Sequence, residues 1–350
     1  MFSTYRPEDV TILLKDITGM VEPLGTEERE RRIQQGGHYS EMLPIEYEPS
    51  APYMTAYKDA LARFAGKTAR AVASAARKIR QKKGKDTVLV SLARAGTPVG
   101  ILLKHYWTEY FREEIPHYTI SIIRGKGIDR QAMNYILSRH RPGQIQFVDG
   151  WTGKGAIQRE LATAMEDYPG VDAGLAVLAD PAGAAAIHGT REDILIASSC
   201  LNATVSGLLS RTFLRPDIIG EKDFHGAVFY RELAKKDMTY SFLQAIEKEF
   251  PVPLCEEEEE AAPATDGREE AREIARHFAI GDINLVKPGI GEATRVLLRR
   301  LPWKVLVHSL SDRENLGHVY QLAREKGVEV VEYPLRNYRA CGLIRSIPDQ

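Results

Sequence analysis

The chain has 350 residues, of which 43% are hydrophobic and 27% charged, and its net charge at pH 7 is −1. This composition predicts a globular protein of about two domains, without a global attraction to nucleic acid or membranes. No apolar leader opens the chain and no run of about 18 apolar residues follows, so we expect a cytoplasmic protein without a membrane span. Three widely spaced cysteines, Cys200, Cys255 and Cys341, predict free thiols rather than disulfides or a zinc site.

Residues 1–50 are rich in Tyr, Pro and Glu and are predicted to form an N-terminal extension rather than a core unit. A helix is predicted from about Met54 to Lys82, where apolar side chains recur every three to four residues. Short apolar segments then alternate with helical patterns. We predict strands at 87–93, 117–125, 144–150, 174–180 and 193–199, and helices at 99–111, 131–140 and 154–168. This alternation predicts an α/β domain over 51–250, with a parallel sheet covered on both faces.

A compositional break follows this domain. Residues 251–268 combine prolines, five consecutive glutamates and small residues, which predicts an acidic linker. Residues 269–350 repeat the alternation on a smaller scale, with helices at 269–279, 291–301 and 315–327 and strands at 304–310 and 328–334. We therefore predict a second, small α/β/α domain.

Two loops at the predicted carboxyl ends of strands carry residues suited to anions. The first is 91–100, where an arginine and a glycine precede a helix whose free amides can bind an anion; its candidate binding residues are Arg94, Ala95, Gly96 and Thr97. The second is 124–131, where Arg124, Lys126 and Arg130 surround two glycines. Such a basic loop could close over a polyphosphate and exclude water.

A third loop follows the predicted strand 144–150. Its turn offers backbone amides, a hydroxyl and an ammonium group to one phosphate, and consists of Gly150, Thr152, Gly153, Lys154 and Gly155. Asp149 at the start of the turn could reach ribose hydroxyls or a magnesium ion. The spacing is that of neither a Walker A loop nor a GxGxxG motif.

In this order, SLARAGTPVG, IIRGKGID and FVDGWTGKG resemble the diphosphate loop, flexible loop and substrate signature of type I phosphoribosyltransferases, over about 50–250. The resemblance implies pentosyl transfer from 5-phosphoribosyl diphosphate, with Mg²⁺, to a base-like or RNA-linked acceptor. It implies catalytic roles for Asp149, Arg124 and Lys126, with Asp149 also at the metal. More specifically, the chain resembles the phosphoribosyltransferase-like proteins of tellurite-resistance and stress-response operons, some of which are labelled StiP and described as cysteine proteases.

Two alternatives remain open. Residues 178–212 could place an acceptor or nucleophile site at the same sheet edge, formed by Asp180, Cys200, Asn202 and Thr204. A cysteine hydrolase would use Cys200 as nucleophile, His188 or His225 as base and Asn202 or Asp223 to orient that base. The other alternative is a non-catalytic nucleotide sensor, which is favoured by a glycine where the family shows a second acid after Asp149.

The second domain resembles the Pelota-type RNA-binding domain. The resemblance rests on a basic, glycine-containing entry to a helix and on a later helix that ends in Glu-Lys-Gly before a strand. It implies RNA as a partner, with phosphate contacts expected from Lys287, Arg295, Arg299 and Arg300. A homodimer is also left open.

Overall fold

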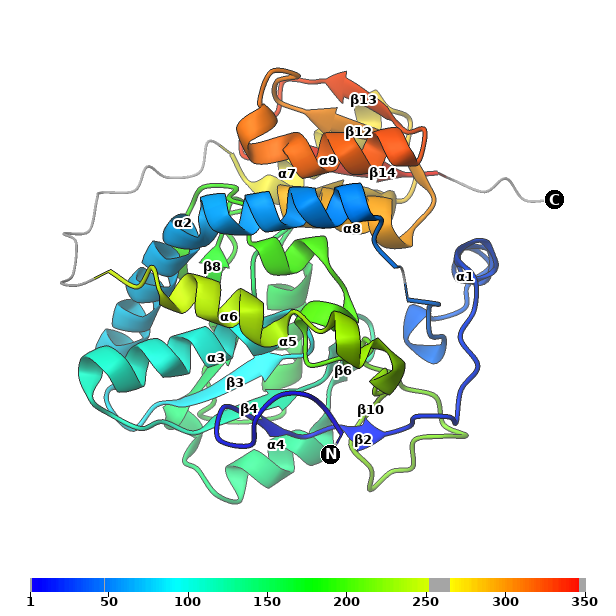
Figure 1. The fold of residues 1–350 in the computed structure, drawn as a ribbon. Helices are drawn as coiled ribbons and strands as arrows, with labels where there is room; N and C mark the ends of the chain where they lie inside the picture. Colours follow the sequence, from blue (N-terminus) through cyan, green and yellow to red (C-terminus); the bar gives the residue numbers. More distant parts are fainter. Residues whose placement is uncertain (1, 47, 252–264, 346–350) are drawn as a thin grey trace.

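The computed structural model describes residues 2–46, 48–251 and 265–345. Most of the predicted linker 251–268 therefore lies outside the described residues. Two domains are stacked on each other. The smaller, upper domain is formed by the part of the chain that follows the linker (Figure 1).

The first domain is built on a six-stranded parallel sheet. Its strands, in spatial order, are β1 (Thr11–Ile12), β4 (His117–Ile120), β3 (Val88–Leu92), β7 (Ile145–Val148), β8 (Leu175–Ala179) and β9 (Ile187–Thr190). The chain runs outward from β3 to β4 and then crosses back to β7 on the other side of β3. Because the order reverses there, the carboxyl ends of β3 and β7 flank the crevice in which such sheets bind ligands.

Helices cover both faces of this sheet, as predicted. The helices are α2 (Ala51–Lys83), α3 (Gly96–Tyr106), α4 (Arg130–Leu137), α5 (Ala156–Met165) and α6 (Thr239–Glu247). One hydrophobic cluster joins α2, α3 and α6 to the sheet, and a second joins α4 and α5 to its other face. α2 begins earlier than predicted because Ser50 caps it through the Tyr53 backbone N–H, and it ends at Gly84, whose φ is +80°.

Residues 1–50, expected as an extension, contribute to this domain. β1 extends the sheet beside β4, and β2 (Lys15–Asp16) pairs with β10 (Gly226–Ala227). α1 (Thr26–Gln34) follows and lies beside the gap between the two domains (Figure 1).

The prediction of a strand at 193–199 is wrong. The strand at this edge of the sheet is β9. Ile194, Leu195 and Ile196 are buried, but they pack in the cluster that holds α2 and α8 rather than joining the sheet. The segment ends in a short 3₁₀ turn at Ala197–Cys200. A short apolar run that is buried on all sides looks the same in sequence whether or not it is hydrogen-bonded as a strand.

The second domain has the predicted three layers. Its helices are α7 (Gly267–His277), α8 (Ile290–Arg299) and α9 (Arg313–Glu325). Its strands, in spatial order, are β11 (Val286–Pro288), β14 (Ala340–Ile344), β12 (Pro302–Val307) and β13 (Glu329–Glu332). α7 packs on one face and α8 with α9 on the other. β14, which the sequence patterns did not reveal, is antiparallel to both of its neighbours.

α2 belongs to both domains. It packs against α3, α6, β8 and β9 of the first domain and against α9 of the second. Arg63 of α2 donates to the Glu314 carbonyl (3.2 Å), and Ser50 donates to the Glu325 carboxylate (2.7 Å). No helix among the described residues is both long and apolar enough to cross a membrane.

Candidate functional site

A cavity of ≈ 1270 Å³ lies between the two domains. Its walls come from α1 and the turn after it, from the loops that follow β3 and β7, and from β11 and α8 of the second domain. The cavity thus includes the crevice at the carboxyl ends of β3 and β7, where the strand order reverses. We take it as the candidate ligand site.

The loops after β3 and β7 lie side by side at this cavity. A Cβ on Gly96 would lie only 2.4 Å from the Val148 carbonyl oxygen, so only glycine permits this approach. Of the four residues expected to bind diphosphate, Ala95 lines the cavity. Arg94 is buried and donates to the Leu209 carbonyl (2.7 Å), and Thr97 shares a hydrogen bond with Thr119 (2.7 Å).

The glycine-rich turn after β7 is occupied by the second domain. The Lys154 ammonium donates to the Val286 carbonyl (2.9 Å) and to the Ile283 carbonyl, and the Tyr338 hydroxyl donates to the Gly153 carbonyl (2.6 Å). Burial, followed by the nearby Lys287 charge, lowers the pKa of Lys154 to about 7. In this structure, therefore, the lysine joins the two domains.

Asp149 and Asp180 differ in how well their carboxylates are satisfied. Asp149 accepts from the Gly150 N–H (2.8 Å), and burial raises its pKa to about 6. Asp180 accepts from Thr152 (2.5 Å), from two backbone N–H groups and from Arg191, and it does not line the cavity. The described residues contain no group of three or more potential metal ligands, and Mg²⁺ at Asp149 stays a prediction.

The basic loop after β4 is fixed rather than open. It forms a small hairpin of β5 (Ile122–Ile123) and β6 (Gly127–Ile128), and the Glu160 carboxylate accepts from the N–H groups of Gly125 (2.8 Å) and Gly127 (2.9 Å). Arg124 lines the cavity and donates to Asn284 (2.9 Å). Lys126 lies outside the cavity lining, 3.7 Å from the Glu41 carboxylate.

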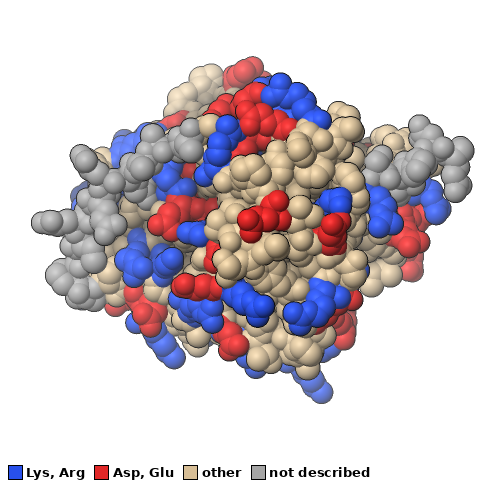
Figure 2. Space-filling model, turned by 90° about the horizontal axis from the view of Figure 1, so that it is seen from above, with Lys and Arg blue, Asp and Glu red and all other residues tan. Residues whose placement is uncertain are grey.

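The four cations expected to bind RNA face the first domain. Arg295 lies over the Trp151 ring (4.4 Å to its centroid), and Arg300 forms two hydrogen bonds with Glu30 (2.7 and 2.9 Å). Arg299 donates to Asn202, and Lys287 lines the cavity. On the outer face seen from above, Lys and Arg are interspersed with Asp and Glu (Figure 2).

Cys200 is fully buried at the end of the 3₁₀ turn, where the Tyr53 hydroxyl donates to its carbonyl (2.8 Å). Burial raises the pKa of its thiol to about 12. Three of its expected partners are engaged elsewhere: His225 with Ser121 (2.8 Å), Asp223 with Lys15 (2.6 Å) and Asn202 with Arg299. His188 lies in β9, and Thr204 is buried close to Cys200 in sequence, outside the cavity lining.

Among the residues of the cavity wall that sequence patterns missed are Arg29, Tyr39 and Arg211. Arg29 stands in the charged segment TEERERRIQ, which is typical of a solvated helix, yet its side chain is only 3% exposed. Tyr39 and Arg211 lie in irregular segments with no motif, and the Arg211 guanidinium covers the Tyr39 ring (5.0 Å). Only the folded chain brings these residues together.

An α/β domain with a parallel sheet, joined to a small Pelota-like domain, is the class of protein that this fold defines. The chain belongs to the StiP family: residues 3–247 match the family model described as "Tellurite-like stress resistance cysteine protease StiP". Residues 265–346 match the model of the PELOTA RNA binding domain. A protein of Acinetobacter baylyi named "Cysteine protease StiP" is 35% identical over 364 residues, covering 98% of this chain and 94% of that protein.

These matches overturn the expected phosphoribosyl transfer. The family model and the Acinetobacter baylyi relative name a cysteine protease, whereas our leading expectation was a glycosyltransferase that uses phosphoribosyl diphosphate. The three loops that suggested this chemistry do follow β3, β4 and β7 of the sheet, but the placement of loops reports architecture and not the reaction. The expected links to tellurite stress and to a Pelota domain are confirmed.

Two solved structures resemble part of the chain. One is the xanthine-guanine-hypoxanthine phosphoribosyltransferase of Helicobacter pylori, 18% identical, covering 34% of this chain and 77% of that one with a TM-score of 0.25. The other is a hypothetical protein of Neisseria gonorrhoeae with bound ppGpp. It is 15% identical, and the match covers 32% of this chain and 66% of that one with a TM-score of 0.25. The likeness at this level is confined to about a third of the chain.

Proposed function

We propose that this protein is a cysteine protease, which hydrolyses peptide bonds through a cysteine thiol. The observation that carries the proposal is the 35% identity, over 98% of the chain, with the relative named "Cysteine protease StiP". A match that spans both domains supports a common activity better than a match to one domain would.

We assign the nucleophile to Cys200. Of the three cysteines in the sequence, Cys200 is the one that falls within the residues matched by the StiP model, 3–247. Cys341 falls within the Pelota match, and Cys255 falls between the two. The assignment requires the thiol to be reduced. Both described cysteines are free.

The activity would be measured with an unstructured protein substrate and with a fluorogenic peptide library, in the presence of a reducing agent. We expect hydrolysis that stops after treatment with iodoacetamide, because the alkylated thiol cannot attack a carbonyl. A metal chelator is the matched control and should leave the rate unchanged. Hydrolysis that survives alkylation, or no hydrolysis of any substrate, would reject the proposal.

A second proposed function is RNA binding, which the Pelota match over residues 265–346 favours. The net charge of −1 gives no global attraction, so any RNA contact depends on local groups. Our candidates remain Lys287, Arg295, Arg299 and Arg300. RNA would have to reach Lys287, Arg295 and Arg300 from the cavity between the domains, which Arg299 does not line.

RNA binding would be measured by fluorescence anisotropy with a labelled RNA that contains a kinked or single-stranded region. We expect the affinity to fall by roughly tenfold or more between 50 and 200 mM salt, as phosphate contacts are screened. DNA of the same sequence is the matched control and should bind more weakly, because it lacks the 2′-hydroxyl groups. Equal affinity for RNA and DNA would indicate charge attraction without RNA recognition.

A further inference from the structure

Three cations on the cavity wall form no ion pair among the described residues. Arg29, Arg211 and Lys287 all line the cavity, and none has a carboxylate within ion-pair distance among the described residues. The Nε atom of Arg29 and the Nε and Nη2 atoms of Arg211 are buried and have no hydrogen-bond partner in the described part of the chain. Buried guanidinium groups are ordinarily paired with acids or hydrogen-bonded, so this arrangement calls for an explanation.

The three cations lie around a fourth cation, Arg300. The charge of Arg300 acts on all three, and Arg300 itself is already paired with Glu30. Burial, followed by the charges of Arg29 and Arg300, lowers the pKa of Arg211 to about 9. Burial also lowers the pKa of Lys287 to about 8. The cluster is therefore a region of like charge. Glu30 and Glu46 act on Arg29, and Glu292 acts on Lys287, without forming an ion pair with them.

Such a cluster is destabilising in the ligand-free protein. A buried cation loses its hydration, and each like charge beside it adds repulsion, which the fold offsets only when an anion is supplied. The Tyr39 ring beneath Arg211 compensates in part through its face. Among the described residues, no acid forms an ion pair with Arg29, Arg211 or Lys287, although Glu30 and Glu46 act on Arg29 and Glu292 acts on Lys287 from a greater distance.

We propose that the cavity between the domains binds a small molecule that carries several phosphate groups, held by Arg29, Arg211 and Lys287. Arginine forks match phosphate oxygens in pairs of parallel hydrogen bonds, and three unpaired cations call for more than one anionic group. The volume of ≈ 1270 Å³ is sufficient for a ligand of nucleotide size. The bound molecule would touch α1, the segment around Arg211 and the second domain at once.

A small ligand fits these observations better than a nucleic acid. The unpartnered nitrogen atoms of Arg29 and Arg211 are buried within the wall and not on the outer surface. The outer face of the second domain seen in Figure 2 carries mixed charges and not a continuous basic path for a strand. The proposal goes beyond the proposed protease activity and does not depend on it, because Cys200 does not line this cavity.

The test is titration calorimetry of the full chain with inorganic tripolyphosphate in 0.15 M salt. We expect binding by the wild type and at least about tenfold weaker binding by Arg29→Gln, Arg211→Gln and Lys287→Gln, since each loses a charge-assisted contact. Arg130→Gln is the matched control, because Arg130 is 76% exposed, pairs with Asp167 and lies outside the cavity. Its affinity should stay within about twofold of the wild type.

Thermal unfolding separates a binding role from a packing role. Tripolyphosphate should raise the melting temperature of the wild type and of Arg130→Gln by similar amounts, and that of Arg211→Gln by less. Without ligand, Arg211→Gln should melt at or above the wild type, because an unpaired buried cation has been removed.

Three results would overturn the proposal. The first is the absence of tripolyphosphate binding by the wild type, and the second is equal affinity in all four variants. The third is binding of a single-stranded RNA that requires Arg29 and Arg211 while tripolyphosphate does not bind, which would make the cavity a nucleic-acid site.

Discussion

Replacing Cys200 by serine is expected to lower the rate of peptide hydrolysis by at least about 10³-fold, because a serine hydroxyl without an adjacent base is a far poorer nucleophile than a thiolate. The measurement is the initial rate on a fluorogenic peptide at saturating concentration. Cys341→Ser is the matched control: that thiol is equally buried and its pKa is likewise raised to about 12, but it lies in the Pelota match. The control should keep the wild-type rate.

The pH dependence of the same rate tests the environment of Cys200. With a thiol pKa of about 12, only about one molecule in 10⁴ carries the thiolate at pH 8. The rate should therefore rise by about tenfold per pH unit between pH 7 and 9. A bell-shaped profile would contradict this expectation and would mean that a histidine approaches the thiol in the working state. Unchanged hydrolysis by Cys200→Ser would remove Cys200 as the nucleophile.

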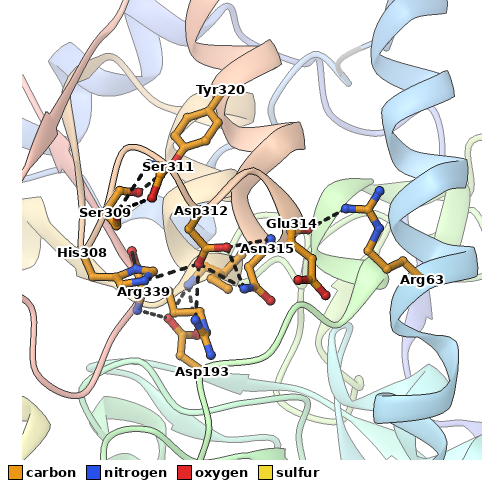
Figure 3. A network of polar contacts seen from close by, with 11 residues as sticks. Arg63, Asp193, His308, Ser309, Ser311, Asp312, Glu314, Asn315, Tyr320 and Arg339 are labelled. Carbon is orange, nitrogen blue, oxygen red and sulfur yellow. Dashed lines mark hydrogen bonds and ion pairs between the residues drawn. The ribbon is translucent and has the colours of Figure 1, made fainter.

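Replacing Asp193 by alanine is expected to lower the free energy of unfolding by about 3 kcal/mol. Asp193 is buried in the first domain, and its carboxylate accepts from the N–H groups of Ile290 (3.1 Å to each oxygen) and Arg339 (2.8 Å) in the second domain (Figure 3). Ile290 is the first residue of α8, so the carboxylate caps that helix from outside its own domain. Alanine would leave both N–H groups buried without an acceptor.

The hydrogen-bond network of Asp193 continues into the second domain. The Arg339 guanidinium reaches Asp312 (3.3 Å), which caps α9 through the Asn315 N–H (3.1 Å; Figure 3).

Burial raises the pKa of Asp193 to about 6, against the effect of its backbone hydrogen bonds. The stability of Asp193→Ala and of the wild type should therefore be compared at pH 8, where the carboxyl is ionised. Urea denaturation would measure the change. Asp217→Ala, in which an exposed acid loses its pairing with Arg215, is the control and should cost at most about 0.5 kcal/mol. A loss below about 1 kcal/mol for Asp193→Ala would contradict the capping role.

The sheet could be predicted because its strands are buried on both faces. β3, β7 and β8 are continuous apolar runs bounded by turns, and each was found within two residues of its observed ends. The same rule failed at 193–199, where the apolar run is buried by α2 and α8 instead. β14 escaped notice because Gly342 interrupts its apolar pattern, and that glycine is needed where α8 packs closely on the strand.

The loops around the candidate site could be recognised from the sequence, but the groups that contact them could not. Lys154 and Gly153 form a turn suited to phosphate, and nothing in the local sequence indicates that Val286 and Tyr338 would occupy it. Arg29 and Asp193 are charged residues in polar surroundings along the chain, and they become buried only through contacts with distant segments. Local patterns report periodicity and turns, whereas a site between two domains depends on how separate units meet.

α2 has a mechanical consequence for the whole molecule. Its 33 residues form one continuous helix, about 50 Å long along its axis, which bends partway (Figure 1) and has neighbours from both domains along it. A hinge motion between the domains would have to bend this helix further or shift α9 along it. The contacts of one helix with both domains therefore disfavour large changes in the width of the gap between the domains.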